Sequence, residues 1–255
     1  MYYSNAVHSP HTFQTSFDFL DAGIVSHHLY ASKYMAGFFH SIQKVNTSIK
    51  TIVLLGPNHF SQGKKLISLS KRQWKTPYGF IKSDQEKVEK IIAQVKNSGI
   101  DEDAFYHEHS ISSLMAFISY YFPYTKVVPI VLNFRLTWED SIELGTFLSG
   151  MLQKDDLLIV STDFVHDKKN DIIKKIDQKN KNKLLNYQEN LESHQISQIE
   201  NDCRKCLLTL FHFLKNKNNS EGEILLNTNS AEISGLDVLA TSYFFVFYGK
   251  KLSRN

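Results

Sequence analysis

Short runs of apolar residues, each closed by glycine, proline or polar residues, recur along the chain. The clearest covers residues 51–55, where Gly56 and Pro57 end the run at once. A continuous apolar run of this length predicts a strand that is buried on both faces. Similar runs at residues 22–25, 127–132 and 157–161 predict three further strands of this kind. Pro129 indicates an edge position or a bulge in the strand that contains it.

Apolar residues at helical spacing lie between these runs. The predicted helices cover residues 29–44, 84–96, 112–122, 138–153 and 184–215. Strands that alternate with helices are typical of a largely parallel sheet. We therefore expect a single α/β domain over residues 1–255, with a largely parallel central sheet flanked by helices. Residues 1–20 are interpreted as an extended lead-in, and residues 223–226 and 240–248 as two closing strands.

Composition and charge exclude several classes of protein. The chain has 255 residues, of which 42% are hydrophobic and 22% charged, and its net charge of +3 is too small to indicate nucleic-acid binding. No apolar stretch is long enough for a membrane helix, and we expect no secretory signal. The lysines of residues 167–183 are interpreted as a solvated helix face rather than a patch for an acidic partner. We expect no nucleic-acid or membrane partner.

The two cysteines, Cys203 and Cys206, have CxxC spacing. A redox pair or half of a zinc site would have this spacing, but no second CxxC follows. We interpret them as buried or incidental thiols in a helix, without a disulfide framework. A reducing, cytoplasmic setting is the corresponding expectation.

Histidines and a carboxylate follow three of the predicted strands. His59 follows residues 51–55, His27 and His28 follow residues 22–25, and Asp163 and His166 follow residues 157–161. Carboxyl ends of parallel strands meet at one edge of a sheet, where ligands bind. We therefore expect the rings of His59 and of either His27 or His28 to lie close enough to share one ion. Each residue taken alone also fits an ordinary turn, and Asp163 fits a helix N-cap.

Two further residues extend this group. His109 stands at the start of a predicted helix, and Glu232 lies in a turn at residues 229–232, where a surface charge is the simpler interpretation. Two histidines and one carboxylate are the ligand set of non-haem iron oxygenases, and a further histidine can act as a general base. The chain has no G-x-S-x-G, P-loop or G-x-G-x-x-G motif, which argues against serine hydrolases, nucleotide kinases and dinucleotide enzymes.

Seven segments in order resemble the Memo family, known in bacteria and archaea as AmmeMemoRadiSam system protein B. They are GIVSHHLY (23–30), LLGPNHF (54–60), WKTPYGF (74–80), EHSI (108–111), VVPIVL (127–132), STDFVH (161–166) and NSAEISG (229–235). The family is similar to the class III extradiol (LigB-type) dioxygenases. The resemblance implies their α/β fold, with a pocket at the edge of the sheet.

The resemblance also implies roles for individual residues. The metal ligands would be His27, His59 and Glu232, and His166 would be the catalytic base, with Asp163 and His109 as further pocket residues. His28 stays an alternative to His27, because Ser26-His27-His28 replaces the family's usual Pro-His. A second histidine of the family's EHSI motif is Leu114 in this chain.

The function expected from these residues is metal-dependent. One iron or copper ion, or else zinc, would support dioxygenase-like redox chemistry on an unknown small molecule. Two alternatives use the same pocket: a non-catalytic adaptor that binds a peptide or other ligand, and a zinc hydrolase. The sequence predicts neither the substrate nor the oligomeric state.

Overall fold

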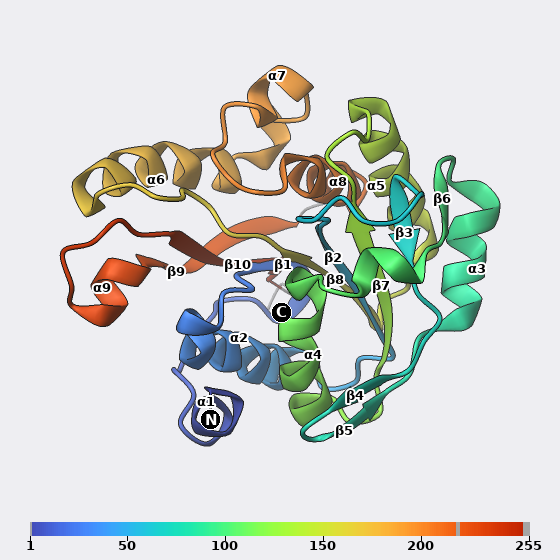
Figure 1. Ribbon diagram of the computed structural model, residues 1–255, viewed down its shortest axis with the longest axis horizontal. Helices are drawn as coiled ribbons and strands as arrows, with labels where there is room; N and C mark the ends of the chain where they lie inside the picture. Colours follow the sequence, from blue (N-terminus) through green and yellow to red (C-terminus); the bar gives the residue numbers. More distant parts are fainter. Residues whose placement is uncertain (1, 218–219, 252–255) are drawn as a thin grey trace.

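A twisted sheet runs through the centre of the computed structural model, which describes residues 2–217 and 220–251 (Figure 1). Among these residues the sheet has eight strands in the order β6-β3-β7-β2-β8-β1-β10-β9. The strands are β1 (Phe19–Val25), β2 (Thr51–Pro57), β3 (Ile67–Leu69), β6 (Ser98–Ile100), β7 (Lys126–Leu132), β8 (Asp156–Ser161), β9 (Glu221–Asn229) and β10 (Ser242–Lys250). A separate hairpin joins β4 (Trp74–Thr76) and β5 (Gly79–Ile81).

The four central strands, β7, β2, β8 and β1, are parallel. Thr51 of β2 is in register with Lys126 of β7 and Asp156 of β8, and Ala22 of β1 is in register with Leu158 of β8. The outer strands β3 and β10 run antiparallel to their inner neighbours. The carboxyl ends of the four central strands therefore meet at one edge, where the turns that follow them come together.

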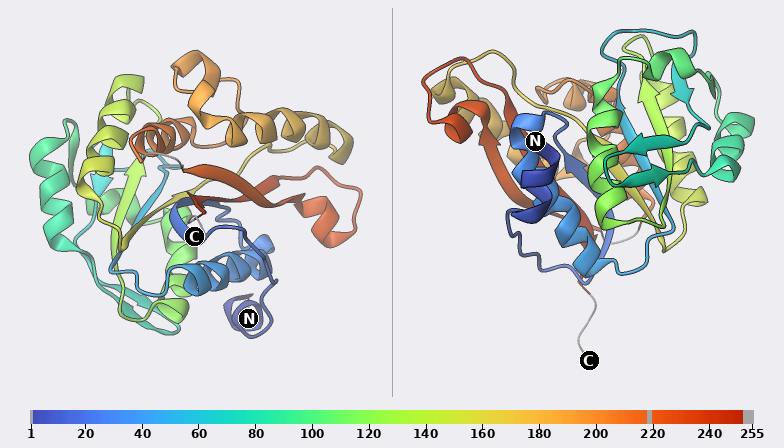
Figure 2. Two further views of the ribbon diagram at one scale, coloured as in Figure 1. Left: turned by 180° about the vertical axis from the view of Figure 1, so that it is seen from behind. Right: turned by 60° about the horizontal axis from the view of Figure 1, so that its bottom comes forward.

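Helices cover both faces of the sheet (Figures 1 and 2). One face carries α1 (Tyr2–His8), α2 (Ser32–Val45) and α4 (His109–Tyr121). The other carries α3 (Gln85–Gln94), α5 (Trp138–Met151), α6 (Asn170–Leu185) and α8 (Arg204–Lys215). The short helices are α7 (Ser193–Ile196), α9 (Ser230–Ser234), η1 (Leu29–Ala31), η2 (Glu102–Phe105) and η3 (Tyr187–Glu189).

Alternation along the central strands explains why both faces need helices. In β2, Ile52 and Leu54 belong to the core shared with α2 and α4, whereas Val53 and Leu55 belong to the core shared with α5 and α8. All seven residues of β2 are buried. An apolar run without polar alternation is stable only where both of its faces are covered. The prediction of a single α/β domain with a largely parallel sheet is thus confirmed.

Three local expectations were wrong. Residues 1–20 are not extended throughout, because Tyr2–His8 form α1, whose Ala6 and Val7 are buried. Residues 184–215 do not form one helix: turns separate α6, η3, α7 and α8. β7 is an interior strand, so Pro129 does not mark an edge. Its pairing with β3 begins only at Ile130, so the residue without an N–H lies just beyond that ladder.

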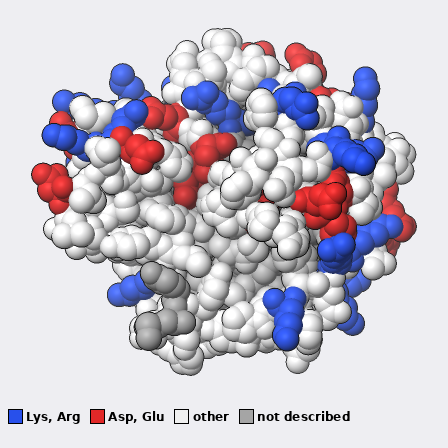
Figure 3. Space-filling view, in the orientation of Figure 1, with Lys and Arg blue, Asp and Glu red and all other residues white. Residues whose placement is uncertain are grey.

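Surface charge agrees with the interpretation of residues 167–183. Lys174 pairs with Glu232 and Lys168 pairs with Glu200, so these lysines are mixed with acidic groups. Figure 3 shows basic and acidic side chains interspersed over the upper part of this face. No helix in the described ranges is both long and apolar enough to cross a membrane.

Candidate metal site

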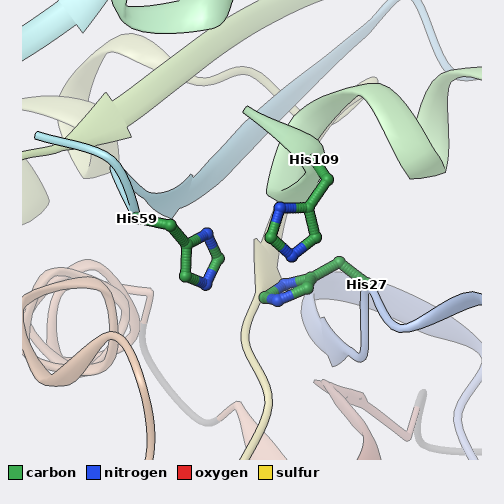
Figure 4. A group of neighbouring side chains, drawn as sticks. All are labelled: His27, His59 and His109. Carbon is green, nitrogen blue, oxygen red and sulfur yellow. The ribbon is translucent and has the colours of Figure 1, made fainter. Parts of the chain in front are cut away.

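Three adjacent strands deliver polar side chains to the shared edge. His27, Asp163 and His59 each stand two residues beyond the ends of β1, β8 and β2. Because β8 lies between the other two strands, Asp163 emerges between the two histidines. His109, the first residue of α4, joins them from the helix layer, and Figure 4 shows the three imidazole rings converging. The expected proximity is observed, since the rings of His27 and His59 lie 5.0 Å apart.

The start of α4 is held against the end of β2. A Cβ atom on Gly56 would lie 2.6 Å from the Ser110 hydroxyl, so only glycine permits this approach without a shift. Ser110 Oγ donates a hydrogen bond to the Pro57 carbonyl (2.9 Å), and Glu108 caps the helix by accepting from the Ser110 N–H (2.8 Å). His109 is thereby placed beside His59, with ring centroids 4.5 Å apart.

Two groups in the described part of the chain could hold a metal ion. His27, His59 and His109 form one group, and His27, Asp163 and Asp202 form the other. In each group the candidate ligand atoms lie within 4.8 Å of one another. His27 is common to both, so it stands at the centre of the site.

Hydrogen bonding determines which nitrogen of His27 is free. Ser161 Oγ donates its proton to the Ser110 carbonyl (2.5 Å), so it accepts from His27 Nδ1 (3.1 Å). Burial lowers the pKa of His27 to about 4, against the opposing effect of Asp202, and the ring is neutral at pH 7. Its Nε2 therefore carries a lone pair. That lone pair lies 3.3 Å from Asp202 Oδ2 and 3.6 Å from Asp163 Oδ2.

His59 is oriented by a buried carboxylate. Its Nδ1 donates to Glu108 Oε1 (2.8 Å), while its backbone N–H donates to Glu108 Oε2 (2.7 Å). His59 Nε2 then lies 3.5 Å from Asp202 Oδ2. Burial lowers the pKa of His59, but the hydrogen bonds with Asp202 and Glu108 outweigh it and raise the pKa to about 10. A carboxylate behind a histidine in this way is the usual support of a metal-ligating imidazole.

Asp202 is the site residue that the sequence analysis missed. Thr162 Oγ1 donates to its Oδ1 (2.6 Å), and its own backbone N–H donates to the Asp163 carbonyl (3.0 Å). These contacts hold the turn before α8 against the end of β8, so one carboxylate approaches both His27 and His59. Asp202 itself belongs to no recognisable motif, although the CxxC pair begins at the next residue. The only sequence signal is an acidic residue immediately before a helix.

Asp163 lies deeper than Asp202. It is buried and accepts a hydrogen bond from Ser26 Oγ (2.5 Å). Burial raises its pKa, although this hydrogen bond acts in the opposite direction. Asp163 is thus a member of the candidate metal group rather than a helix N-cap, since α6 begins only at Asn170.

The remaining predicted residues lie at the exposed side of the candidate metal site or outside it. The His166 side chain is 45% exposed, with Nε2 3.9 Å from Asp202 Oδ2. His28 is exposed and turns toward the Tyr243 hydroxyl. Glu232 belongs to neither candidate group, because it pairs with Lys174 (3.0 Å) and accepts from Thr228 Oγ1 (3.1 Å). Leu114 is fully buried among apolar residues.

Cys203 and Cys206 form a disulfide, so the expectation of free thiols was wrong, although their expected burial is confirmed. Cys203 is the N-cap of α8, and both residues are buried. One helical turn brings the two Cα atoms within 5.2 Å, inside the usual range for a disulfide. The bridge therefore closes the first turn of α8 immediately after Asp202.

Fold and site together define an α/β protein with a histidine and aspartate cluster, able to hold a metal ion, at the carboxyl edge of a parallel sheet. The sequence pattern of the Memo-like protein family matches residues 21–246. This chain belongs to that family, and the resemblance seen in its motifs is confirmed.

Individual relatives agree with this assignment. A MEMO1 family protein of Sulfurisphaera tokodaii is 31% identical over 216 residues, covering 78% of this chain and 72% of the relative. One of Caldivirga maquilingensis is 26% identical over 212 residues, covering 79% and 73%. A crystal structure of an uncharacterized protein from Escherichia coli K12 superposes with a TM-score of 0.51 at 11% identity, covering 88% of this chain and 99% of that one. This last likeness concerns the fold alone.

Proposed function

We propose that the chain is a metal-dependent oxidoreductase that acts on a small molecule, with one iron or copper ion held between His27 and His59. The observation that carries this proposal is the environment of His27 Nε2. Its lone pair faces the carboxyl groups of Asp202 and Asp163, at 3.3 Å and 3.6 Å, and one metal ion can be bound by all three groups.

The donor set fits a transition metal. Ligands about 2.1 Å from one ion lie roughly 3.0–3.6 Å from each other, and Asp202 Oδ2 lies 3.3 Å from His27 Nε2 and 3.5 Å from His59 Nε2. His109 completes the set of imidazoles. Imidazole with carboxylate suits iron, copper and zinc. In this proposal Asp202 takes the carboxylate position that the family resemblance assigned to Glu232.

The surrounding residues orient these donors. Ser161 directs His27 Nε2 into the site, and Glu108 does the same for His59 Nε2. A bound iron or copper ion would supply one-electron and O₂ chemistry that side chains lack. His166 stands at the exposed side, where its Nε2 would carry a proton between the reacting molecule and solvent.

The test is metal content. Protein prepared without a histidine tag is analysed for iron, copper and zinc by mass spectrometry, before and after reconstitution. We expect about one equivalent of iron or copper in the parent protein and none in His27→Ala. The matched control is His28→Ala, which changes the neighbouring histidine but should keep the metal, because His28 faces Tyr243. Electron paramagnetic resonance of the loaded protein then reports the ligand set.

The outcomes separate the alternatives. No metal above trace, with no uptake on reconstitution, would refute the proposal and favour the peptide- or ligand-binding adaptor. Stoichiometric zinc in a redox-inactive protein would favour the hydrolase. The substrate, any peptide partner and the cytoplasmic location stay predictions.

A further inference from the structure

A cavity of about 420 Å³ opens beside the candidate metal site. A volume of this size accommodates a small organic molecule. The lining residues that matter here are His59, Asn133, Trp138, Asp202, Arg204 and Lys205. His59 and Asp202 belong to both the cavity and the metal site, so a molecule in the cavity lies next to the proposed ion.

The end of the cavity at α8 is basic. Arg204 and Lys205 are the first two residues of α8, a helix of 12 residues whose N-cap makes no side-chain capping hydrogen bond. Within the described ranges neither cation makes an ion pair: Arg204 Nε donates to the Ile199 carbonyl, and Lys205 Nζ lies 3.4 Å from the centroid of the Trp138 ring. The helix N-terminus adds its partial positive charge.

Asn133 supplies an independent sign of a missing ligand. The residue is 1% exposed, and its Oδ1 accepts hydrogen bonds from the backbone N–H (3.0 Å) and Nε (3.4 Å) of Arg135. This fixes the orientation of the amide, and its Nδ2 has no hydrogen-bond partner in the described part of the chain. A buried donor without an acceptor is costly and rare in folded proteins. Because Asn133 lines the cavity, we take an acceptor oxygen bound there as the partner of this donor.

The side chains of Asn58 and Asp202, which also line the cavity, already have partners. Asn58 bonds through both side-chain atoms to the backbone of Gln62. Asp202 is negative, but its carboxylate is engaged with Thr162 and lies beside His59. Asp202 lies beside the proposed metal site, whereas the cations Arg204 and Lys205 lie on the first turn of α8. The indole of Trp138, over which Lys205 Nζ lies, adds an apolar surface to the lining.

We propose that this cavity binds a small organic carboxylate, with its anionic group near Asn133, Arg204 and Lys205 and its apolar body against Trp138. The orientation of the rest of the molecule toward His59 rests on the proposed metal function, whereas binding of the carboxylate does not. Burial lowers the pKa of Lys205 to about 8, against the effects of Glu139 and Asp140, so the cation is present at pH 7. A carboxylate can bond to Asn133 and a cation together.

The experiment measures the affinity of benzoate and 3-phenylpropionate for the full chain by isothermal titration calorimetry at pH 7. Benzamide, the neutral counterpart of benzoate, is the ligand control. Chelator-treated and metal-loaded protein are compared, so that direct binding to the metal is separated from binding in the cavity. We expect saturable carboxylate binding in both forms, with benzamide at least about tenfold weaker.

Two variants test the residues. Lys205→Met keeps the length of the side chain and should weaken carboxylate binding about tenfold. Asn133→Asp keeps the acceptor for Arg135 but replaces the free donor with a negative charge, and should abolish binding. Lys215→Met, at the exposed opposite end of the same helix, is the matched control and should bind as the parent protein does. Thermal melting checks that each variant folds.

Two results would overturn the inference: no saturable binding of either carboxylate, or equal binding of benzoate and benzamide that is insensitive to Lys205→Met. Neither result affects the metal proposal, which is judged by metal content. Conversely, carboxylate binding that depends on Lys205 in a chain without metal would leave the cavity assignment standing and the metal proposal refuted.

Discussion

Two segments each offer a carboxylate to the histidine site: the turn before α8, which contains Asp202, and the short helix α9 after β9, which contains Glu232. The first places Asp202 3.3 Å from His27 Nε2. The second places Glu232 in an ion pair with Lys174 at the surface. The family resemblance favours Glu232, whereas the geometry favours Asp202.

The order of strands explains the difference. β9 lies two strands beyond β1, which at ~4.8 Å per strand is about 10 Å across the sheet. The turn before α8 instead lies over the end of β8, because the Asp202 N–H donates to the Asp163 carbonyl (3.0 Å). Lateral position in the sheet therefore decides which carboxylate reaches the histidines. Asp202 approaches the histidines because its turn lies over the end of β8, whereas Glu232 lies in α9, which follows the outermost strand β9.

The largest expected effect is on metal affinity. Asp202→Asn keeps the shape of the side chain but removes the charge between His27 and His59, and we expect at least about 100-fold weaker metal binding. Glu232→Gln should leave the affinity within about twofold. Competition with a chelator of known affinity measures both. A larger loss of metal affinity in Glu232→Gln than in Asp202→Asn would show that Glu232, and not Asp202, is the ligand.

Acid stability should depend on Glu108. Burial alone would raise its pKa, but hydrogen bonds and the charge of His59 outweigh burial and lower the pKa to about 2 from an ordinary 4.5. A lowered carboxyl pKa stabilises the folded state above about pH 4.5, and this stability is lost as the pH falls toward 2. We expect Glu108→Gln to cost about 2–3 kcal/mol at neutral pH in metal-free protein.

Urea unfolding at a series of pH values checks this. The gap between the parent protein and Glu108→Gln should be widest above pH 5 and narrow as the pH falls. A gap that does not change between pH 7 and pH 3 would show that the carboxylate adds no pH-dependent stability. Metal affinity of the same variant should fall about tenfold, because His59 loses its support.

The contact between Thr162 and Asp202 should matter for both stability and metal. Thr162→Val removes a buried hydroxyl that donates to Asp202 (2.6 Å), and we expect a loss of about 1–2 kcal/mol in the free energy of unfolding. Thr209→Val is the matched control, since it removes a buried hydroxyl that donates to the Ser141 carbonyl (3.1 Å). Both variants lose stability, but only Thr162→Val should also weaken metal binding. Equal metal affinity in the two variants would show that Asp202 does not contribute to metal binding.

The smallest effect is expected at the other segment. Lys174→Met removes the partner of Glu232 in an exposed ion pair, and should change stability by less than about 0.5 kcal/mol. Metal affinity should not change. A clear loss of metal would show that Glu232 and α9 contribute to the site after all.

The strands and the histidines were predictable because their signals are local. Residues 51–55 are apolar without interruption, which requires burial on both faces, and His59 follows the resulting strand within a few residues. The same holds for His27 after β1 and for Asp163 after β8. Parallel strands share an edge, so the meeting of these residues also followed from the sequence. Helix α1 was not predicted from the sequence, because it is stabilised by the packing of Ala6 and Val7 and not by a strong local pattern.

The sequence by itself thus determined the class of fold, the edge of the sheet that carries the site and the two histidines at its centre. Only the tertiary structure decided the carboxylate and the support of His59. Asp202 reaches the site through contacts with Thr162 and Asp163, about forty residues away in the chain, and Glu108 lies 49 residues from His59. Such contacts leave no periodic pattern in the sequence. They depend on the position of a turn relative to the strands of the sheet and not on the residues next to that turn in the chain.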